Sequence, residues 1–233
     1  MKNPTLEIMA GKERPGARKE ASGERGVTRI GVLGGSFDPP HVGHLVLAQD
    51  AAEFLSLDAV LFIPAAQAPL KPASPVAPAD LRLEMLRAAV APHAARGWAV
   101  SDWEMRRGGE SFSIHTARHL LATHPGAEIH WLIGADRLAD LARWNCATEL
   151  FQLVHFAAAQ RTNADGGGAP AKPPSAPAGA RVVFLPPRRL DISSTEIRAR
   201  LGAGLPVDLF LPPGVNEIIQ RRMPYQPPPG GFP

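Results

Sequence analysis

Strand-like and helix-like segments alternate along most of this 233-residue chain. Short apolar runs that end near Gly or Pro predict strands, and longer segments with apolar residues every three to four positions predict helices. The predicted strands cover residues 27–33, 58–64, 98–101, 128–134, 153–160 and 181–186, and the predicted helices cover 43–56, 79–90, 113–123, 193–201 and 215–222. This order predicts an α/β fold, a Rossmann-like, doubly wound and largely parallel sheet with helices on both faces, whose ligands bind at the carboxyl ends of the strands.

Three stretches lie outside this alternation. Residues 1–26 are polar and rich in Gly and charge, so we expect a disordered N-terminal extension. One domain should span residues 27–222, interrupted by a Gly- and Pro-rich mobile loop at about 162–180. The Pro- and Gly-rich residues 223–233 predict a flexible tail.

Composition narrows the class of protein. Hydrophobic residues make up 45% of the chain and charged residues 20%, as in folded soluble proteins. The net charge of +3 comes without a basic stripe interleaved with aromatic residues in the folded part, so nucleic-acid binding is not indicated. With Cys146 as its one cysteine the chain cannot form an internal disulfide, which fits a reducing cytoplasm. We find no signal peptide and no apolar run of about 18 residues, so we expect a cytoplasmic protein without a membrane span.

The most informative segment is GGSFDPPHVGH at residues 34–44, where the first predicted strand meets the first predicted helix. Gly34 and Gly35 allow the backbone to approach a ligand without an intervening Cβ, and a helix start offers N–H groups and the positive end of a dipole. His41 and His44 are three positions apart, so both side chains can reach one phosphate group. We therefore expect an anion site here.

Better-known nucleotide and metal motifs fit this segment poorly. No Gly-Lys-Ser/Thr follows at Walker spacing, and GVLGGS lacks the GxGxxG pattern of dinucleotide-binding proteins. Two histidines without a carboxylate at ligand spacing make a poor zinc site. A single histidine near a helix start is usually a surface residue or a cap, but a pair beside a double glycine favours ligand binding. We expect Asp38 to hold the turn through backbone hydrogen bonds.

A second candidate anion site lies at residues 192–201, ISSTEIRARL. Ser193 and Glu196 form a capping-box pattern at the start of an amphipathic helix, which by itself indicates only a helix start. The segment also supplies more donors than a cap needs. They are Ser194, Thr195, the free amides of the first turn and Arg198, all able to converge on a polyphosphate.

The two segments together resemble the paired signatures of the HxGH nucleotidyltransferase superfamily. Within it the chain is similar to nicotinate-nucleotide adenylyltransferases, and the resemblance runs from about residue 30 to residue 222. Three middle segments support this narrower choice: IPAAQAPLK (63–71), SDWEMRRGGESFSIHT (101–116) and LIGADRLADLARW (132–144). The chain departs from the family pattern at Leu70, where His is common, and at Phe112-Ser113, where Tyr-Thr is common.

The resemblance implies adenylyl transfer from ATP to nicotinate mononucleotide, and it implies roles for individual residues. The implied ATP-binding residues are Gly34, Gly35, Ser36, Phe37, His41, His44, Asp136, Ser194, Thr195 and Arg198. The implied catalytic residues are His44, His41, Arg198 and Lys71, with His44 the better candidate for stabilising the transition state. Asp136 would bind the ribose hydroxyls, although it could instead cap the helix that follows it.

On the acceptor side, Trp144 would stack on the pyridine ring, and backbone amides near Ser113 and Asn145 would bind the pyridine carboxylate. From sequence alone Trp144 could equally be a core residue. No protein-built metal site is expected, because Mg²⁺ keeps its waters and would arrive on the ATP phosphates. Whether the chain forms a homo-oligomer is left open.

Three alternatives remain at this point. The same chemistry could use another acceptor, such as phosphopantetheine or a small alcohol phosphate, because the two phosphate signatures are shared across the superfamily. A silent nucleotide-binding sensor is a second alternative, which the full set of cationic side chains argues against. The third is nucleic-acid binding, suggested by a sequence pI of about 9.4 but opposed by the lack of a basic stripe in the folded part.

Overall fold

The computed structural model describes residues 27–69, 75–160, 175–188 and 190–225. These residues form one six-stranded sheet in the order β3-β2-β1-β4-β5-β6, in which every neighbouring pair is parallel. The strands are β1 (Arg29–Gly35), β2 (Ala59–Pro64), β3 (Trp98–Val100), β4 (Glu128–Gly134), β5 (His155–Ala159) and β6 (Val182–Phe184). This order confirms the predicted doubly wound fold.

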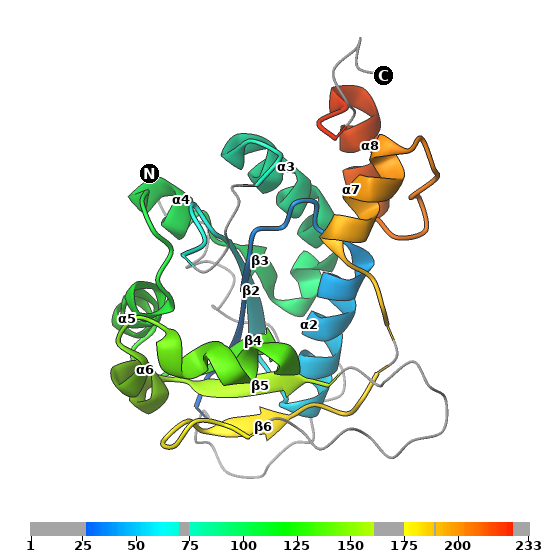
Figure 1. The fold of residues 1–233 in the computed structure, drawn as a ribbon. Helices are drawn as coiled ribbons and strands as arrows, with labels where there is room; N and C mark the ends of the chain where they lie inside the picture. The colour runs from blue at the N-terminus through cyan, green and yellow to red at the C-terminus, as the bar shows by residue number, and fades with distance from the viewer. Residues whose placement is uncertain (1–26, 70–74, 161–174, 189, 226–233) are drawn as a thin grey trace.

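Helices connect the strands and cover both faces of the sheet (Figure 1). The α-helices are α2 (Val42–Phe54), α3 (Ala79–Val90), α4 (Trp103–Arg107), α5 (Ser113–Thr123), α6 (Ala147–Leu153), α7 (Ser194–Gly202) and α8 (Pro213–Arg222). Two 3₁₀ helices, η1 (Ala91–Arg96) and η2 (Ala135–Arg143), complete the set in the described residues. The sequence prediction gave α3 and α5 with the observed bounds, expected a helix after Asp136 where η2 lies, and missed η1, α4 and α6.

Alternating strand residues separate the core into two layers. In β4, Trp131 and Ile133 pack with α5, η2 and α6 on one face, while Leu132 packs with α2 and α3 on the other. Gly31 of β1 serves the second layer, because a Cβ there would lie 2.6 Å from the Leu57 side chain. Both faces are therefore buried, as the near-continuous apolar runs of the strands predict.

A third apolar cluster joins α3, α7 and α8. These helices gather at one end of the molecule in Figure 1. Tyr225, three residues beyond α8, is only 7% exposed and belongs to this cluster. The predicted flexible tail from residue 223 therefore does not describe Tyr225, whose ring is packed in this cluster.

Neighbouring strands β1 and β4 define the point where the strand order reverses. Chain connections leave in opposite directions on the two sides of this point, which opens a crevice at the carboxyl ends of the strands. The segment 34–44 leaves β1 at this edge, and residues 134–136 leave β4 beside it.

Parts of the predicted domain plan lie outside the described residues. These parts are the extension at 1–26, most of the loop at 162–180, and residues 226–233. No helix in the described ranges is both long enough and apolar enough to cross a membrane.

Candidate active site

The double glycine at the end of β1 is not required by packing within the protein. Gly34 is exposed, and a Cβ added to it would meet its nearest neighbour at 3.9 Å, an ordinary contact. A Cβ on Gly35 would likewise stay 3.6 Å from the Phe37 ring. Since none of the described residues excludes a side chain at Gly34, its lack of one is consistent with backbone that a ligand approaches closely.

His41 and His44 lie in contact at the start of α2, with ring centroids 3.8 Å apart. Gly43 makes room for this pair, because a Cβ there would lie 2.9 Å from His41 Nδ1. The backbone N–H of His41 donates to His44 Nδ1 over 3.1 Å. An accepting Nδ1 carries no proton, so the neutral His44 ring carries its proton on Nε2 and can donate it to an anion.

The first turn of α2 is less open than the sequence predicts. The Val42 N–H donates to the Phe210 carbonyl over 3.0 Å, and the His44 N–H donates to the His41 carbonyl over 3.0 Å. The expectation that this helix start offers its amides to an anion is therefore wrong for these two groups. The imidazole side chains and the loop before the helix must supply more of any phosphate contact.

The structure buries two residues that the resemblance assigns to ATP. Phe37 is 2% exposed, and its ring lies 4.9 Å from the His44 ring and 6.4 Å from the Phe62 ring. Ser36 is 9% exposed. Phe37 has φ 49°, a left-handed conformation that few non-glycine residues adopt. Any contact of Phe37 with ATP must use its backbone, because its ring is buried against the rings of His44 and Phe62.

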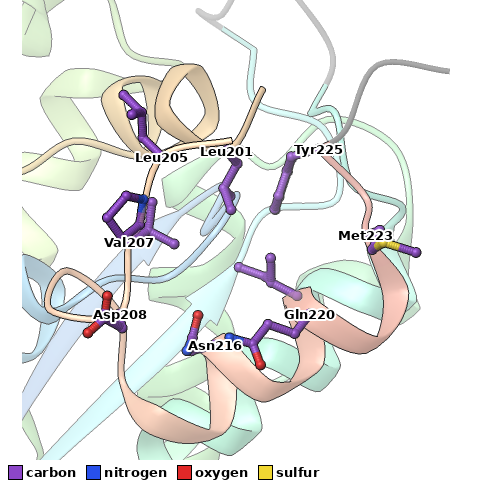
Figure 2. A pocket seen from close by; sticks show the side chains of 10 residues that line it. Leu201, Leu205, Val207, Asp208, Asn216, Gln220, Met223 and Tyr225 are labelled. Carbon is purple, nitrogen blue, oxygen red and sulfur yellow. The ribbon is translucent and has the colours of Figure 1, made fainter. Parts of the chain in front are cut away.

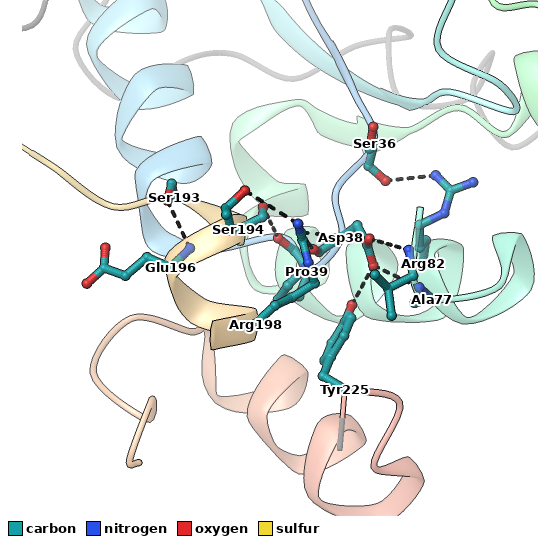
Figure 3. Close-up of polar contacts among 12 residues, drawn as sticks. Ser36, Asp38, Pro39, Ala77, Arg82, Ser193, Ser194, Glu196, Arg198 and Tyr225 are labelled. Carbon is teal, nitrogen blue, oxygen red and sulfur yellow. Dashed lines mark hydrogen bonds and ion pairs between the residues drawn. The ribbon is translucent and has the colours of Figure 1, made fainter. Parts of the chain in front are cut away.

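The second predicted segment starts α7, with Ser193 as the cap residue. Ser193 Oγ accepts a hydrogen bond from the Glu196 N–H over 3.1 Å, which confirms this half of the predicted capping box. Ser194 Oγ donates to the Pro39 carbonyl over 2.9 Å, and Arg198 Nη1 donates to the Asp38 carbonyl over 2.7 Å. The two segments, about 155 residues apart in the chain, are thus bonded directly to each other (Figure 3).

These bonds limit which groups remain for phosphate. A serine hydroxyl has a single proton, and that of Ser194 is committed to Pro39, so Ser194 can donate to an anion only through its backbone N–H. Arg198 has five N–H donors, of which one serves Asp38 and another lies 3.4 Å from Thr195 Oγ1. Arg198 is partly exposed, and Thr195 is exposed at the first turn of α7.

Asp38 accepts backbone hydrogen bonds, as predicted, but from a segment far away in the chain. Its carboxylate is 4% exposed and accepts from the Val76 N–H (2.7 Å), the Ala77 N–H (3.0 Å) and the Tyr225 hydroxyl (2.8 Å). Arg198 Nη1 lies 3.8 Å from the same carboxylate. Asp38 therefore joins its loop to distant segments, where the sequence suggested bonds within its own turn.

Arg82 of α3 was not predicted and fixes the same loop. It is 2% exposed, and its Nη1 donates to the carbonyls of Ser36 (2.7 Å) and Ala65 (2.9 Å). Burial lowers the pKa of the Arg82 guanidinium, against the raising effect of the nearby Asp38 charge. One signal existed in the sequence: Arg82 occupies a position on the apolar face of its helix, in register with Met85 and Leu86.

Asp136 follows β4 and is exposed at the predicted ligand edge. Gly134, not Asp136, occupies the cap position of η2, and no side-chain cap bond forms, so the alternative of a capping role is not supported. A Cβ on Gly134 would lie 2.3 Å from Asp136 Oδ1, so a side chain there would require the exposed Asp136 carboxylate to move. Arg137 Nε lies 3.7 Å from the Asp136 carboxylate.

The acceptor-side residues come from α5, η2 and the segment before α6. Ser113 is the first residue of the 11-residue α5, so its amide is one that helix geometry leaves without an intrahelical partner. Trp144 directly follows η2 and is half-buried, with its ring edge-on to that of Phe156 at a centroid distance of 6.3 Å. Asn145 is exposed beside it. Lys71 lies outside the described residues, so the structure does not place it.

A buried carboxyl that the sequence did not single out braces the α5 start. Glu104 of α4 accepts from Thr116 Oγ1 of α5 and also hydrogen-bonds Ser111, whose Oγ accepts from the Ala66 N–H over 2.9 Å. Burial raises the pKa of the Glu104 carboxyl, and the bonds from Thr116 and Ser111 oppose that rise. The loop after β2 and the loop before α5 are therefore held together.

No group of three or more His, Cys, Asp or Glu side chains within the described ranges is placed to hold a metal ion. The described side chains therefore do not fit a Mg²⁺ ion that is held by protein ligands alone.

Comparisons with known proteins identify the family of this chain. Residues 32–200 match the model of the cytidylyltransferase-like family. A probable nicotinate-nucleotide adenylyltransferase of Opitutus terrae is 42% identical over 199 residues, covering 85% of this chain and 98% of the relative. A relative of the same name from Methylacidiphilum infernorum is 37% identical over 202 residues, covering 85% of this chain and 93% of its own.

A solved structure shares the fold. The Plasmodium falciparum nicotinic acid mononucleotide adenylyltransferase complexed with NaAD matches with a TM-score of 0.65 at 17% identity, covering 85% of this chain and 97% of that one. At this identity the likeness bears on the fold alone, while the curated relatives extend over nearly the whole described chain. The chain therefore belongs to the cytidylyltransferase-like family, among its nicotinate-nucleotide adenylyltransferases.

Proposed function

We propose that this enzyme transfers the adenylyl group of ATP to the phosphate of nicotinate mononucleotide, giving nicotinate adenine dinucleotide and pyrophosphate in NAD biosynthesis. The observation that carries the proposal is the direct bonding of Ser194 and Arg198 to the loop that precedes His41 and His44. Two cationic, helix-start segments meet there at the carboxyl edge of the sheet. Such an arrangement suits a polyphosphate.

On the ATP side, His41, His44 and the backbone of residues 34–37 would contact the phosphates. The backbone amides of Ser194 and Thr195, together with the uncommitted donors of Arg198, would bind the β- and γ-phosphates. Asp136 would accept hydrogen bonds from the ribose hydroxyls, which its exposed position after β4 supports. Lys71 would add a phosphate contact.

The reaction needs no general base. The acceptor phosphate has a second pKa of about 6, so it is mostly dianionic at neutral pH and attacks without losing a proton. Its oxygen forms a bond to the α-phosphorus, the bond from that phosphorus to the bridging oxygen breaks, and pyrophosphate leaves with the electron pair. The protein contributes position and charge stabilisation, with the Nε2 proton of His44 directed to a phosphate oxygen.

Mg²⁺ would reach the site as part of the ATP substrate. When bound to phosphates it neutralises part of their charge, and it commonly keeps its own waters. The described side chains then need only hold the phosphates and orient them.

On the acceptor side, Trp144 would stack on the pyridine ring, and the amides at Ser113 and Asn145 would bind the carboxylate. The Ser113 amide lies at the positive end of a helix dipole, which favours an anion over a neutral amide. The bracing of α5 by Glu104 would keep this amide in place.

We propose that the enzyme works in the cytoplasm.

Pyrophosphate release tests the proposal. ATP and Mg²⁺ are supplied with nicotinate mononucleotide, nicotinamide mononucleotide or phosphopantetheine in separate reactions. Strong preference for the nicotinate form is the expected result. Release with another acceptor would retain the chemistry and refute the acceptor, and ATP binding without release in any reaction would favour a sensor.

A further inference from the structure

Tyr225 is anchored in the C-terminal apolar cluster rather than in the proposed active site. Its ring lines a pocket of about 380 Å³ between α7 and α8, shared with Leu201, Val207 and Ile219 (Figure 2). None of the residues that line this pocket was predicted to bind a substrate. Packing in this cluster accounts for the Tyr225 ring, but it gives no role to the Tyr225 hydroxyl.

The hydroxyl of Tyr225 reaches out of this cluster to the loop that precedes α2. It donates to Asp38 Oδ1 over 2.8 Å, and both groups are buried. Burial raises the pKa of the Tyr225 hydroxyl strongly, and the nearby Asp38 charge raises it further. The hydroxyl therefore remains a donor throughout the physiological pH range.

Asp38 is the residue where the two phosphate segments meet. Its carbonyl receives Arg198, and the next carbonyl, of Pro39, receives Ser194 (Figure 3). A change in the position of Asp38 would therefore move Arg198 relative to His41. Since phosphate transfer depends on such positions within fractions of an ångström, the groups that fix Asp38 matter for turnover.

We propose that Tyr225 is a positioning residue for adenylyl transfer, which acts through Asp38 to hold the loop of residues 36–41 against Arg198. This inference rests on the proposed function, because it assigns ATP phosphates to that loop and to Arg198. It extends the machinery of the site to a residue beyond the last helix.

Tyr225→Phe separates the hydroxyl from the ring, because the ring stays in its pocket. The matched control is Ile219→Val, which trims a buried side chain of the same cluster without contacting Asp38. Thermal unfolding shows how far each variant is destabilised. The dissociation constant for ATP is measured by calorimetry without acceptor, and kcat and KM are measured for both substrates.

Loss of one hydrogen bond to a buried charge predicts that Tyr225→Phe weakens ATP binding and lowers kcat/KM for ATP by about three- to tenfold. The KM for nicotinate mononucleotide should be unchanged, because α5 and Trp144 hold that substrate. Ile219→Val should lose about as much thermal stability as Tyr225→Phe. Its dissociation constant and kcat/KM for ATP should be unchanged. Unchanged ATP parameters in Tyr225→Phe, or equal losses in Ile219→Val, would overturn the inference.

A second measurement needs no turnover. Tyr225 is the one tyrosine of the chain, so incorporation of 3-fluorotyrosine gives a single fluorine resonance. ATP alone should shift this resonance, and a resonance unmoved at saturating ATP would contradict the proposed link. A wild-type protein that binds ATP but releases no pyrophosphate with any acceptor would refute the proposed function alone, since calorimetry and fluorine spectra would still decide the role of Tyr225.

Discussion

Two substitutions of His44 can separate its structural bond from its expected catalytic one. In the structure Nδ1 accepts from the His41 N–H over 3.1 Å, which leaves the ring proton on Nε2. Asn places an amide oxygen near the position of Nδ1 but has no group at the position of Nε2. Gln does the reverse, with an amide nitrogen near Nε2 and nothing that accepts at Nδ1. The pair therefore tests each nitrogen separately.

We expect His44→Asn to affect mainly turnover and His44→Gln to affect mainly stability. If Nε2 donates to charge that develops in the transition state, His44→Asn should lower kcat by roughly 10²–10³-fold, the effect of losing one such donor. Its stability should change little, because the bond to His41 is kept. His44→Gln should retain more turnover but lose about 1 kcal/mol of stability, as when a helix loses its cap.

Steady-state pyrophosphate release gives kcat, and urea unfolding gives the free energy of unfolding. Near-normal turnover in His44→Asn would refute the catalytic assignment of Nε2. Equal losses of turnover in the two variants would show that the ring is needed for its shape alone, and that the tautomer inferred from Nδ1 has no part in catalysis.

Three further predictions concern other parts of the chain. Gly34→Ala should fold normally yet bind ATP more weakly in calorimetry, whereas Gly97→Ala, with φ +79° and a Cβ 2.6 Å from the Asp58 carbonyl, should lose about 1–3 kcal/mol in urea unfolding and keep its affinity for ATP. Burial lowers the pKa of His130 from 6.5, so the unfolded chain takes up the extra proton. The melting temperature should therefore be highest above pH 6.5 and should fall as the pH drops towards the lowered pKa of His130. In His130→Val the melting temperature should depend less on pH over this range. Arg82→Met leaves two carbonyls without their buried donor and should lower the free energy of unfolding by about 1–3 kcal/mol, with an unchanged urea midpoint as the refuting result.

The fold could be predicted because its signals are local. Apolar runs such as that of residues 128–134 fix a strand through its own composition, and α5 appears with the predicted bounds because its apolar residues repeat at helical spacing. The missed elements are short. The helix at residues 103–107 has 5 residues and that at 147–153 has 7, too few for a periodic pattern to stand out from chance.

The site could be predicted only where its residues are neighbours in the chain. The two segments that bind each other were each visible as a motif, but nothing in either motif indicates that Ser194 meets Pro39. Tyr225 and Asp38 are 187 positions apart, and the pair leaves no periodic trace. Arg82 is the intermediate case, because a charged residue on an apolar helix face is a local anomaly whose partner remains hidden.

The donors already committed inside the protein change how the triphosphate must be held. The Ser194 hydroxyl donates its hydrogen bond to the Pro39 carbonyl, and one N–H of Arg198 donates to the Asp38 carbonyl. These bonds hold both residues in place without a ligand, so under the proposed function their remaining donors would reach the ATP phosphates with little further loss of conformational freedom. The proposed ATP site would therefore depend on the packing of α7 and Tyr225, from the end of the domain, against the loop after the first strand. Donors that are held in place in this way favour the transition state over the bound substrate. They do not have to reorient when charge develops on the phosphate oxygens.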